Sequence, residues 1–571
     1  MPKLVLTNKV HRLDNRTIAR LLYFPFCEPN ASGSIILPAE GVAMQRRLIS
    51  SDFSKLLWRV VSATLSVLVL FWLALMPAHA QTATDPGIRL GPIDAGGFVS
   101  GLNTYQQEME EPATNFFEEV NNVAGGTSVK RVGLGARFDS NSCNSCHGQP
   151  EPGGTSPAPC GIANSPFPTC GNQLASVYTL MGATNTLPIF EASQTSSGCD
   201  SATCAPTLVA RAPYQPDLVT PNGHVQQLFT ITDRTDAGTC DIQQPDFALL
   251  SAENNLIFRN TTPFFGGGLI EIINDADILA NMNANLTLKM SLGISGNANI
   301  DPDDGSVDRF GWKAQNRSLL AFVGEAYNVE EGIDNEFFPN KTDETPGCTP
   351  PFPLGPPNGN GTHGVPDDRT DWAFLPATGY LMPGDPERFA IFGRFLAGPT
   401  PGACSYSKTS SCTNGQTYFA SIGCVLCHNN AIPNTNYTGF TTPSSSISAL
   451  GSVQVNLYSD LLVHHMGVCL ADNVAQGDAA GDEFRTMPLW GVGQRYFFLH
   501  DARTTDIVTA IEEHADGYQQ ANGIPGCSGN PNAAYPPSEA DAVIAAFNNL
   551  STVSGVDGTA QQDLVNFLRS L

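Results

Sequence analysis

The apolar positions of this chain repeat with a helical period mainly in its second half. Side chains spaced three and four apart predict helices at 276–290, 318–327 and 386–396, and again at 505–514, 538–550 and 561–571. Between them, frequent Gly and Pro predict long loops. A stretch at about 155–255, rich in Ser, Thr, Pro and Cys, predicts an irregular insertion with some strand. We therefore expect a mainly α fold with long loops.

One continuous apolar run, at 56–76, predicts export from the cytoplasm. Basic residues precede it, and Ala78-His79-Ala80 follows it, which is typical of a secretory signal cut after Ala80. The alternative is an uncleaved membrane anchor, because residues 60–76 almost span a bilayer. We expect residues 1–80 to be removed and the mature protein to be periplasmic or secreted. It would contact a membrane only if the signal stays uncleaved.

The charge balance limits the choice of partners. The chain of 571 residues carries 29 Lys and Arg against 54 Asp and Glu, a formal net charge of −25. Nucleic acid is excluded as a partner, because so acidic a chain would not neutralise a phosphate backbone. A basic partner would instead be attracted at low salt.

Two Cys-x-x-Cys-His motifs, at 143–147 and 424–428, carry the clearest chemical signal. Two thiols one helical turn apart can both form thioethers to a porphyrin, and the next residue presents an imidazole to the iron. Zinc is the alternative, but it would need a second Cys pair or a further His spacing near each motif. We expect two covalently bound haem c groups, held by these residues: Cys143, Cys146, His147, Cys424, Cys427 and His428.

The separation of the motifs predicts two cytochrome c-like haem domains, because each haem needs its own helical shell. We expect an N-terminal domain at 81–346, which contains the insertion, and a C-terminal domain at 365–571. The Pro- and Gly-rich stretch 347–364 is the predicted linker.

The remaining cysteines of the expected mature chain predict structural disulfides, because an exported chain matures in an oxidising compartment. They are even in number: Cys160, Cys170, Cys199, Cys204, Cys240, Cys348, Cys404, Cys412, Cys469 and Cys527. Short-range pairing would join Cys199 to Cys204, Cys160 to Cys170 and Cys404 to Cys412, but spacing alone leaves the connectivity open.

Several segments resemble the di-haem oxidoreductases of peroxidase type. The family is related to bacterial di-haem cytochrome c peroxidases and to the di-haem enzyme that matures methylamine dehydrogenase. The resemblance covers roughly 95–150 and 255–571, in the right order. The segments that carry it are 264–271 (FFGGGLIE), 309–314 (RFGWKA), 394–399 (RFLAGP), 457–467 (LYSDLLVHHMG), 487–493 (MPLWGVG) and 498–503 (FLHDAR).

The resemblance implies a role for each haem. His147 would be the proximal ligand of the active N-terminal haem, and His428 the proximal ligand of the C-terminal electron-transfer haem. His514 would be the sixth ligand of the latter, although a His that only interacts with the helix dipole is the alternative. The competitors for that position are Met466, His464 and His465, whereas we expect His500 to organise hydrogen bonds near the haem propionates.

The resemblance also implies catalytic residues at the open haem. Glu330, with Glu331 beside it, falls in the register of a distal carboxylate that moves a proton between the peroxide oxygens. Trp312 matches a Trp that relays electrons between the haems. The alternatives are a solvated acidic loop and an ordinary core Trp. Phe322 replaces a distal Gln and makes the pocket more apolar, and His224 lies in a turn where a surface position is expected.

The function that follows is reduction of a small-molecule oxidant, hydrogen peroxide, with electrons from a small cytochrome c or cupredoxin. An oxygenase or oxidase of an organic substrate at the N-terminal haem is one alternative, and a non-enzymatic electron carrier is another. In the peroxidase relatives a calcium ion lies between the domains. Asp301, Asp303 and Asp304 offer oxygen ligands for one here, and a solvated acidic loop explains them equally well.

Overall fold

The computed structural model divides the chain into two units, Met1–Ala78 and His79–Leu571. All residues that it describes belong to the second unit: 83–89, 95–122, 125–126, 137–157, 184–186, 229–232, 259–333, 335, 337–338, 373–374, 381–382, 384–404, 408–516 and 535–571. The predicted signal at 56–76, the linker at 347–364, His224 and most of the insertion lie outside these ranges. None of the helices within these ranges combines the length and the apolar character needed to cross a bilayer.

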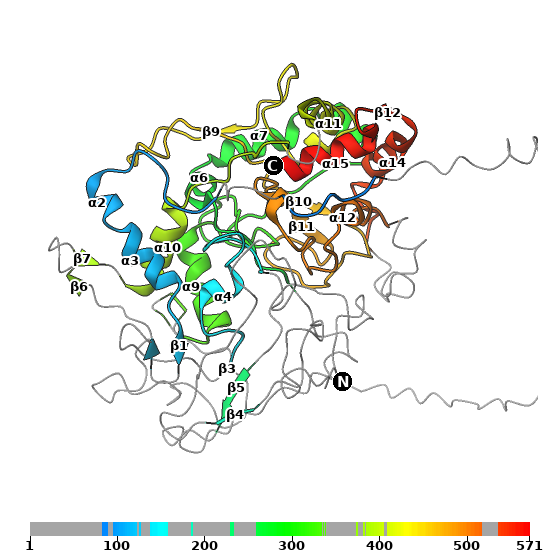
Figure 1. Cartoon of the computed structure of the whole chain (residues 1–571). Coiled ribbons are helices and arrows are strands. Elements are labelled where there is room, and N and C mark those ends of the chain that lie inside the picture. Colours follow the sequence, from blue (N-terminus) through cyan, green and yellow to red (C-terminus); the bar gives the residue numbers. More distant parts are fainter. Residues whose placement is uncertain are drawn as a thin grey trace, which may run out of the picture. The chain divides into compact units, whose positions relative to one another are not determined.

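One group of helices surrounds the first Cys-x-x-Cys-His motif, whose cysteines bound the short helix α4 (Cys143–Cys146). Helix α10 (Asp385–Phe395) contacts α3 (Glu110–Phe117), α6 (Gly267–Glu271) and α9 (Leu319–Glu330) (Figure 1). Their shared core is aromatic: the rings of Phe117 and Phe392 stack with centroids 4.3 Å apart.

A second group of helices surrounds the other motif, at whose start lies the 3₁₀ helix η1 (Cys424–Leu426). Helix α11 (Thr409–Ser421), which leads into the motif, packs along α15 (Ala560–Ser570) (Figure 1). Gly415 permits this close approach, because a Cβ there would lie 2.1 Å from the Asp563 carbonyl oxygen. Helices α12 (Ile507–Glu512) and α14 (Asp541–Asn549) complete the group.

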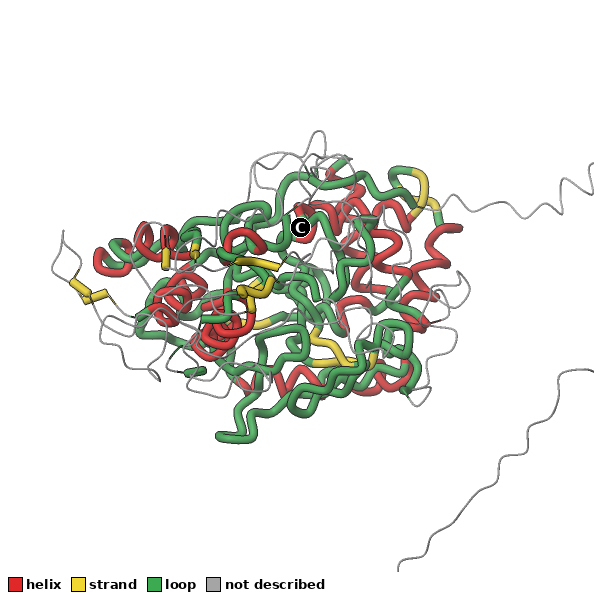
Figure 2. The backbone as a smooth tube through the Cα atoms, turned by 90° about the horizontal axis from the view of Figure 1, so that it is seen from below, coloured by secondary structure: helices red, strands yellow, loops and turns green. Residues whose placement is uncertain are grey.

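The strands form small antiparallel sheets. β5 (Phe229–Thr232) pairs with β3 (Arg137–Phe138) and β4 (Thr184–Thr186), and β10 (Val463–His465) pairs with β11 (Glu483–Arg485). The other pairs are β1 (Asn121–Asn122) with β2 (Gly125–Gly126), β6 (Ala373–Phe374) with β7 (Leu381–Met382), β8 (Phe440–Thr441) with β9 (Gln454–Val455), and β12 (Ser554–Gly555) with β13 (Gly558–Thr559). Within the described ranges, the architecture is helices joined by long loops and short strand pairs (Figure 2).

The helix predictions agree with the structure at α9, α10, α12, α14 and α15, whose ends differ from the predicted ones by a few residues. The single helix predicted at 276–290 is wrong. The structure has α7 (Asp275–Asn283) and α8 (Leu286–Leu292), separated where Asn285 adopts a left-handed φ of 56°. The remaining helical turns are α2 (Thr104–Gln107), η2 (Val492–Gln494) and η3 (Leu550–Thr552).

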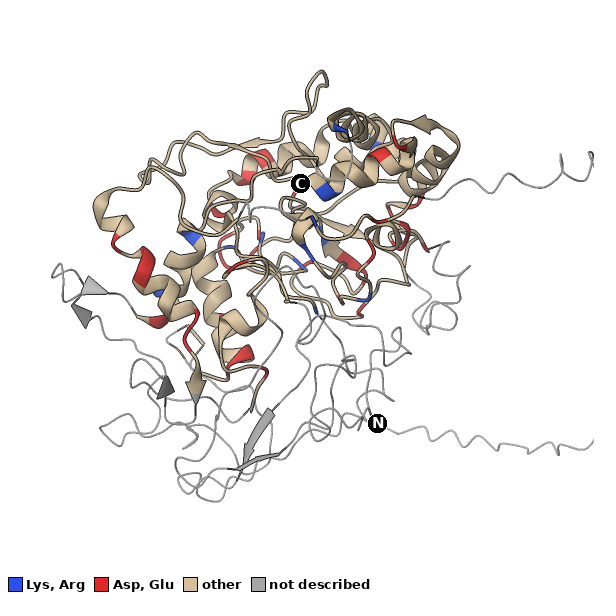
Figure 3. Ribbon diagram, in the orientation of Figure 1, with Lys and Arg blue, Asp and Glu red and all other residues tan. Residues whose placement is uncertain are grey.

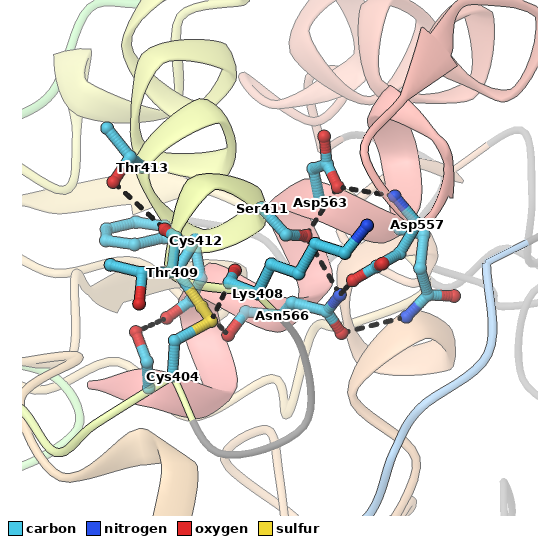
Figure 4. The surroundings of a disulfide bond; sticks show 12 residues. Cys404, Lys408, Thr409, Ser411, Cys412, Thr413, Asp557, Asp563 and Asn566 are labelled. Atoms are coloured by element: carbon cyan, nitrogen blue, oxygen red, sulfur yellow. Dashed lines mark hydrogen bonds between the residues drawn. A yellow bond between two sulfur atoms is a disulfide. The ribbon is translucent and has the colours of Figure 1, made fainter.

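One of the short-range cysteine pairs lies at disulfide-bonding distance. Cys404 and Cys412 join the segment before α11 to its first turn, next to the hydrogen bond from Ser411 to Asp563 of α15 (Figure 4). Cys469 is also disulfide-bonded. The other two predicted pairs lie outside the described residues. By contrast, none of the four cysteines of the two Cys-x-x-Cys-His motifs is in a disulfide.

Candidate functional site

A cavity of about 220 Å³ adjoins the second Cys-x-x-Cys-His motif. Cys424, Cys427 and His428 line it, and His514 reaches it from the turn after α12. The rest of its wall is largely apolar and comes from segments far apart in the sequence: Phe419, Leu489, Val492, Phe498, Ile507, Val543, Leu564 and Leu568. A hydrophobic cavity that two free thiols and two imidazoles share suits a porphyrin with an iron at its centre.

Hydrogen bonds at Nδ1 orient both imidazoles. His428 Nδ1 lies 3.0 Å from the Tyr458 carbonyl oxygen, and His514 Nδ1 lies 2.6 Å from that of Ala510. Burial, and then the proximity of His514, lower the pKa of His428 to about 4, and burial lowers the pKa of His514. Because a carbonyl only accepts, each neutral ring carries its proton on Nδ1 and keeps the lone pair of Nε2 for a metal.

The other predicted competitors differ from this pattern. His464 lies between two carboxylates, with Nδ1 2.7 Å from Glu539 Oε2 and Nε2 3.0 Å from Asp460 Oδ2. Although burial opposes the charge, Cys427 and Asp460 raise the pKa of His464 well above its ordinary value. A ring that donates from both nitrogens has no lone pair for iron, even though His464, Asp460 and Cys427 place ligand atoms within 4.8 Å of one another.

Of the two remaining competitors for the sixth ligand position, one is excluded by its hydrogen bonds and one is not. His465 Nδ1 lies 2.9 Å from Asp482 Oδ2, and its Nε2 lies 3.6 Å from Glu483 Oε1. Both nitrogens of His465 therefore face carboxylates. Met466 lines the cavity, so its thioether stays an alternative to His514.

At the first motif, His147 is held in the same way as His428. Its Nδ1 lies 3.2 Å from the Gly154 carbonyl oxygen, and its ring meets the edges of Phe117 and Phe264 with centroids 5.9 and 4.9 Å apart. Burial lowers the pKa of His147 to about 4, so the imidazole is neutral. Phe264 also lines a small apolar cavity of about 20 Å³, together with Phe322.

Both predicted distal carboxylates lie beside the first motif. Glu330, at the end of α9, is exposed and shares a hydrogen bond with the Asp139 carboxyl; burial, and then the charge of Glu330, raise the pKa of Asp139 well above its ordinary value. Burial, followed by the charge of Glu330, raises the pKa of Cys146 to about 12.

Glu331 is the more enclosed of the two carboxylates, with an exposed fraction of 3 %. Its Oε1 accepts from Cys143 Sγ at 3.3 Å, and its Oε2 accepts from Asn121 Nδ2 at 2.7 Å. Sequence reasoning placed Glu330 first and Glu331 second. In the structure α9 ends at Glu330, and it is Glu331, the next residue, that is buried. The sequence contains no spacing that predicts this difference in burial.

Trp312 lies at the cavity of the second motif and also next to a segment that touches the first. Its indole Nε1 donates to the Asn260 carbonyl at 2.5 Å, and it lines the 220 Å³ cavity. Two residues along the chain, the Thr262 backbone forms a hydrogen bond with the His147 ring. Segment 260–264 thus contacts His147 at one point and Trp312 at another.

His500 is a buried residue of the 220 Å³ cavity. It is 3 % exposed and stacks on Phe484 with ring centroids 4.2 Å apart, and burial lowers its pKa to about 4.

The acidic loop at 301–304 forms its own hydrogen bonds. Asp301 and Asp304 each accept from a backbone N–H of their own loop at 2.8 Å, and Asp303, between them, is exposed. These contacts are those of a polar turn, and a calcium ion there stays a prediction.

Comparison with known proteins gives one match. The sequence model of the family described as "Di-haem oxidoreductase, putative peroxidase" matches residues 223–351 and 387–522. These ranges contain the second motif, Trp312, Glu330 and His514, whereas the first motif lies before them. No curated protein and no solved structure matches the chain.

Proposed function

The chain belongs to the family of di-haem oxidoreductases, and from this premise we propose that it is a periplasmic enzyme with two covalently bound haem c groups that reduces hydrogen peroxide. The observation that carries the proposal is the state of the two Cys-x-x-Cys-His motifs. In each, neither cysteine is in a disulfide and the imidazole is neutral and oriented through Nδ1, whereas the other described cysteines are in disulfides.

The residues at the second motif fit a haem. Cys424 and Cys427 would form the thioethers, and His428 and His514, which both line the cavity, would offer Nε2 to the iron. The bound group would supply an iron that takes up and passes on single electrons. Two imidazole ligands favour a lower reduction potential than an imidazole with a thioether, so His514 suits a site that delivers electrons.

Peroxide reduction consumes two protons and two electrons for each molecule and gives two molecules of water. One proton must also move between the peroxide oxygens before their bond breaks heterolytically. Glu330 and Asp139 are suited to that transfer, because two hydrogen-bonded carboxylates near the first motif hold a proton between them at a raised pKa. Glu331, 3.3 Å from Cys143 Sγ, is the second candidate for this role.

Electrons would enter from a small, basic cytochrome c or cupredoxin. Most Asp and Glu of the described residues are not buried, whereas Lys289, Arg309, Lys313, Arg485 and Arg569 are among the buried cations. Figure 3 marks both kinds of residue along the ribbon. Such a surface attracts a basic partner. Trp312, between the second cavity and segment 260–264, is our candidate relay toward His147.

An oxygenase of an organic substrate is the second candidate, and one observation favours it. Phe322, which replaces the distal Gln of the peroxidases, lies parallel to Phe310 with ring centroids 6.2 Å apart, and both line the small apolar cavity beside Phe264. An apolar pocket of this small size suits dioxygen better than it suits peroxide.

The test is turnover by the exported, haem-loaded protein, measured as peroxide consumption with a reduced basic cytochrome c as donor. We expect Glu330→Gln or Glu331→Gln to slow turnover by about 10²- to 10⁴-fold, because the proton-transfer group is lost. Glu110→Gln, an exposed acid on α3, is the matched control and should leave the rate unchanged. No peroxide turnover with any donor, together with dioxygen uptake on an apolar polyene, would establish the oxygenase instead.

A further inference from the structure

Two arginines face the cavity of the second motif without a carboxylate partner. Arg485 is 5 % exposed, and Arg495 is half-buried. Both line the cavity that Cys424 and His428 share. Burial, and then the positive charge of Arg495, lower the pKa of Arg485 to about 9.

The hydrogen-bond acceptors of these two arginines are uncharged groups. Arg485 donates from Nε to the Gly311 carbonyl at 2.8 Å and from Nη2 to the Met487 sulfur at 3.1 Å. Arg495 donates from Nη2 to the Pro488 carbonyl at 2.6 Å, and its buried Nε has no acceptor among the described residues. None of these acceptors carries a negative charge.

Most other buried cations of the described chain have a carboxylate partner, although the buried Lys289 ammonium donates only to the Asn281 and Met282 carbonyls. Ion pairs to carboxylates hold four of them: Arg309 to Asp275, Lys313 to Asp472, Arg503 to Asp501 and Arg569 to Asp85. A guanidinium taken out of water without an anion is unfavourable, and the positive charge of Arg495 adds to the cost at Arg485. An anion that enters the cavity would therefore stabilise both arginines.

We propose that Arg485 and Arg495 form a carboxylate cradle that binds the two propionates of the haem at the second motif. The inference rests on the proposed haem c at Cys424 and Cys427. The charges of the two partners are opposite and their groups are equal in number: the haem carries two carboxylates and the cradle carries two guanidinium groups. Each guanidinium can bind a carboxylate through two N–H donors. His500, whose buried Nε2 also lacks an acceptor, lines the same cavity and supplies a neutral third donor.

The same cradle would fit a soluble dicarboxylate or phosphate, and the experiment separates the two sources. Redox potentiometry of the full haem-loaded protein would follow each haem in Arg485→Gln, Arg495→Gln and the double variant. Loss of a nearby positive charge disfavours electron uptake. We expect each single variant to shift the reduction equilibrium of the C-terminal haem about tenfold toward the ferric form, and the double variant to shift it further.

Three controls make the shift specific. Because Arg485 also lines the small cavity beside Phe264, the N-terminal haem is the control in Arg495→Gln, where it should keep its midpoint potential. Both haems of Arg317→Gln, which removes a half-exposed arginine paired with Asp275, should keep theirs as well. Arg485→Lys and Arg495→Lys keep the charge and should return the midpoint toward that of the unaltered protein. These lysine variants also decide the case if the glutamine variants fail to retain haem.

Several results would overturn the cradle. One is an unchanged C-terminal midpoint in both glutamine variants that carry two haems, and another is a loss of haem that neither lysine variant restores. A third is stabilisation of the unaltered protein, but not of the variants, by added phosphate or succinate without any change in midpoint, since that would assign the cradle to a soluble anion. Absence of covalent haem from the unaltered protein would instead overturn the proposed function.

Discussion

Hydrogen bonding at individual ring nitrogens separates the histidines that can bind iron from those that cannot. His147, His428 and His514 each direct Nδ1 at a backbone carbonyl, whereas His464 and His465 face carboxylates. The sequence identifies all five as candidates. The motifs and the family resemblance already put His147, His428 and His514 first. The hydrogen bonds that exclude His464 and His465 could not be predicted, because the carboxylates concerned come partly from segments up to 75 residues away.

Replacement of His514 tests its ligand role. In His514→Ala the C-terminal haem loses its sixth ligand, so we expect its low-spin ferric signal in electron paramagnetic resonance to be replaced by a high-spin one. His465→Ala is the matched control, because it removes an imidazole near the same cavity and should leave the low-spin signal in place. A low-spin signal that persists in His514→Ala would transfer the role to Met466.

The carboxylates around His464 predict how stability depends on pH. Although burial alone would raise it, the hydrogen bond and charge of His464 and bonds from Ser295 lower the pKa of Glu539 to about 2. The unfolded chain therefore takes up this proton first, so the stabilisation is complete above about pH 4.5 and is lost as the pH falls toward 2.

Glu539→Gln should lower the free energy of unfolding by about 3 kcal/mol at pH 7, because it leaves a buried imidazolium with one partner fewer. Denaturant unfolding would measure the difference, which should shrink as the pH falls from about 4.5 toward 2. Glu111→Gln, an exposed acid on α3, should change stability by less than about 0.5 kcal/mol. Equal effects of the two substitutions would contradict this account of the pair.

At the scale of elements, the sequence predicts helices well where apolar side chains recur on one face. It predicts α9, α10 and α15 for that reason. It misses α11, whose sequence TSSCTNGQTYFAS is mostly polar and becomes helical through packing against α15. The prediction from the sequence also merges α7 and α8 into one helix, because a residue with left-handed φ, such as Asn285, ends a helix without changing the pattern of apolar residues.

Gly415 tests the contact between α11 and α15. An added methyl group would meet the Asp563 carbonyl and the Phe567 side chain of α15, so the helices would have to separate. We expect Gly415→Ala to lower the free energy of unfolding by about 1 to 3 kcal/mol. Because Phe419 and Leu568 of these helices line the cavity, the absorption spectrum of the C-terminal haem should change as well. Thr417→Ala, at an exposed position of α11, should do neither.

At the scale of the whole molecule, the sequence establishes two properties best: the net charge of the chain and the presence and spacing of its two Cys-x-x-Cys-His motifs. Two Cys-x-x-Cys-His motifs and the family segments lead directly to a di-haem oxidoreductase, and the family match agrees. The arginine cradle and the pairing of Asp139 with Glu330 could not be predicted from the sequence. Each brings together residues from different segments, and no spacing or motif in the sequence indicates that these segments meet.

The acidic exterior predicts how the donor reaction depends on salt. Without residues 1–80 the chain carries 20 Lys and Arg against 50 Asp and Glu, so the exported protein should react with a basic cytochrome c at a rate that falls by about tenfold or more as ionic strength rises from about 0.01 M to about 0.15 M. Stopped-flow reduction would measure it, with an acidic cytochrome of similar potential as the control. A rate that does not change with salt would argue against electrostatic recognition of the donor.

The most direct test of the central claim is electron paramagnetic resonance on the exported, haem-loaded protein, oxidised and half-reduced, with and without peroxide. We predict a high-spin ferric signal that disappears on addition of peroxide, from an open haem at His147. A low-spin signal from a haem held by His428 and His514 should persist beside it. Two low-spin signals that do not respond to peroxide in either state would contradict the claim and leave an electron carrier.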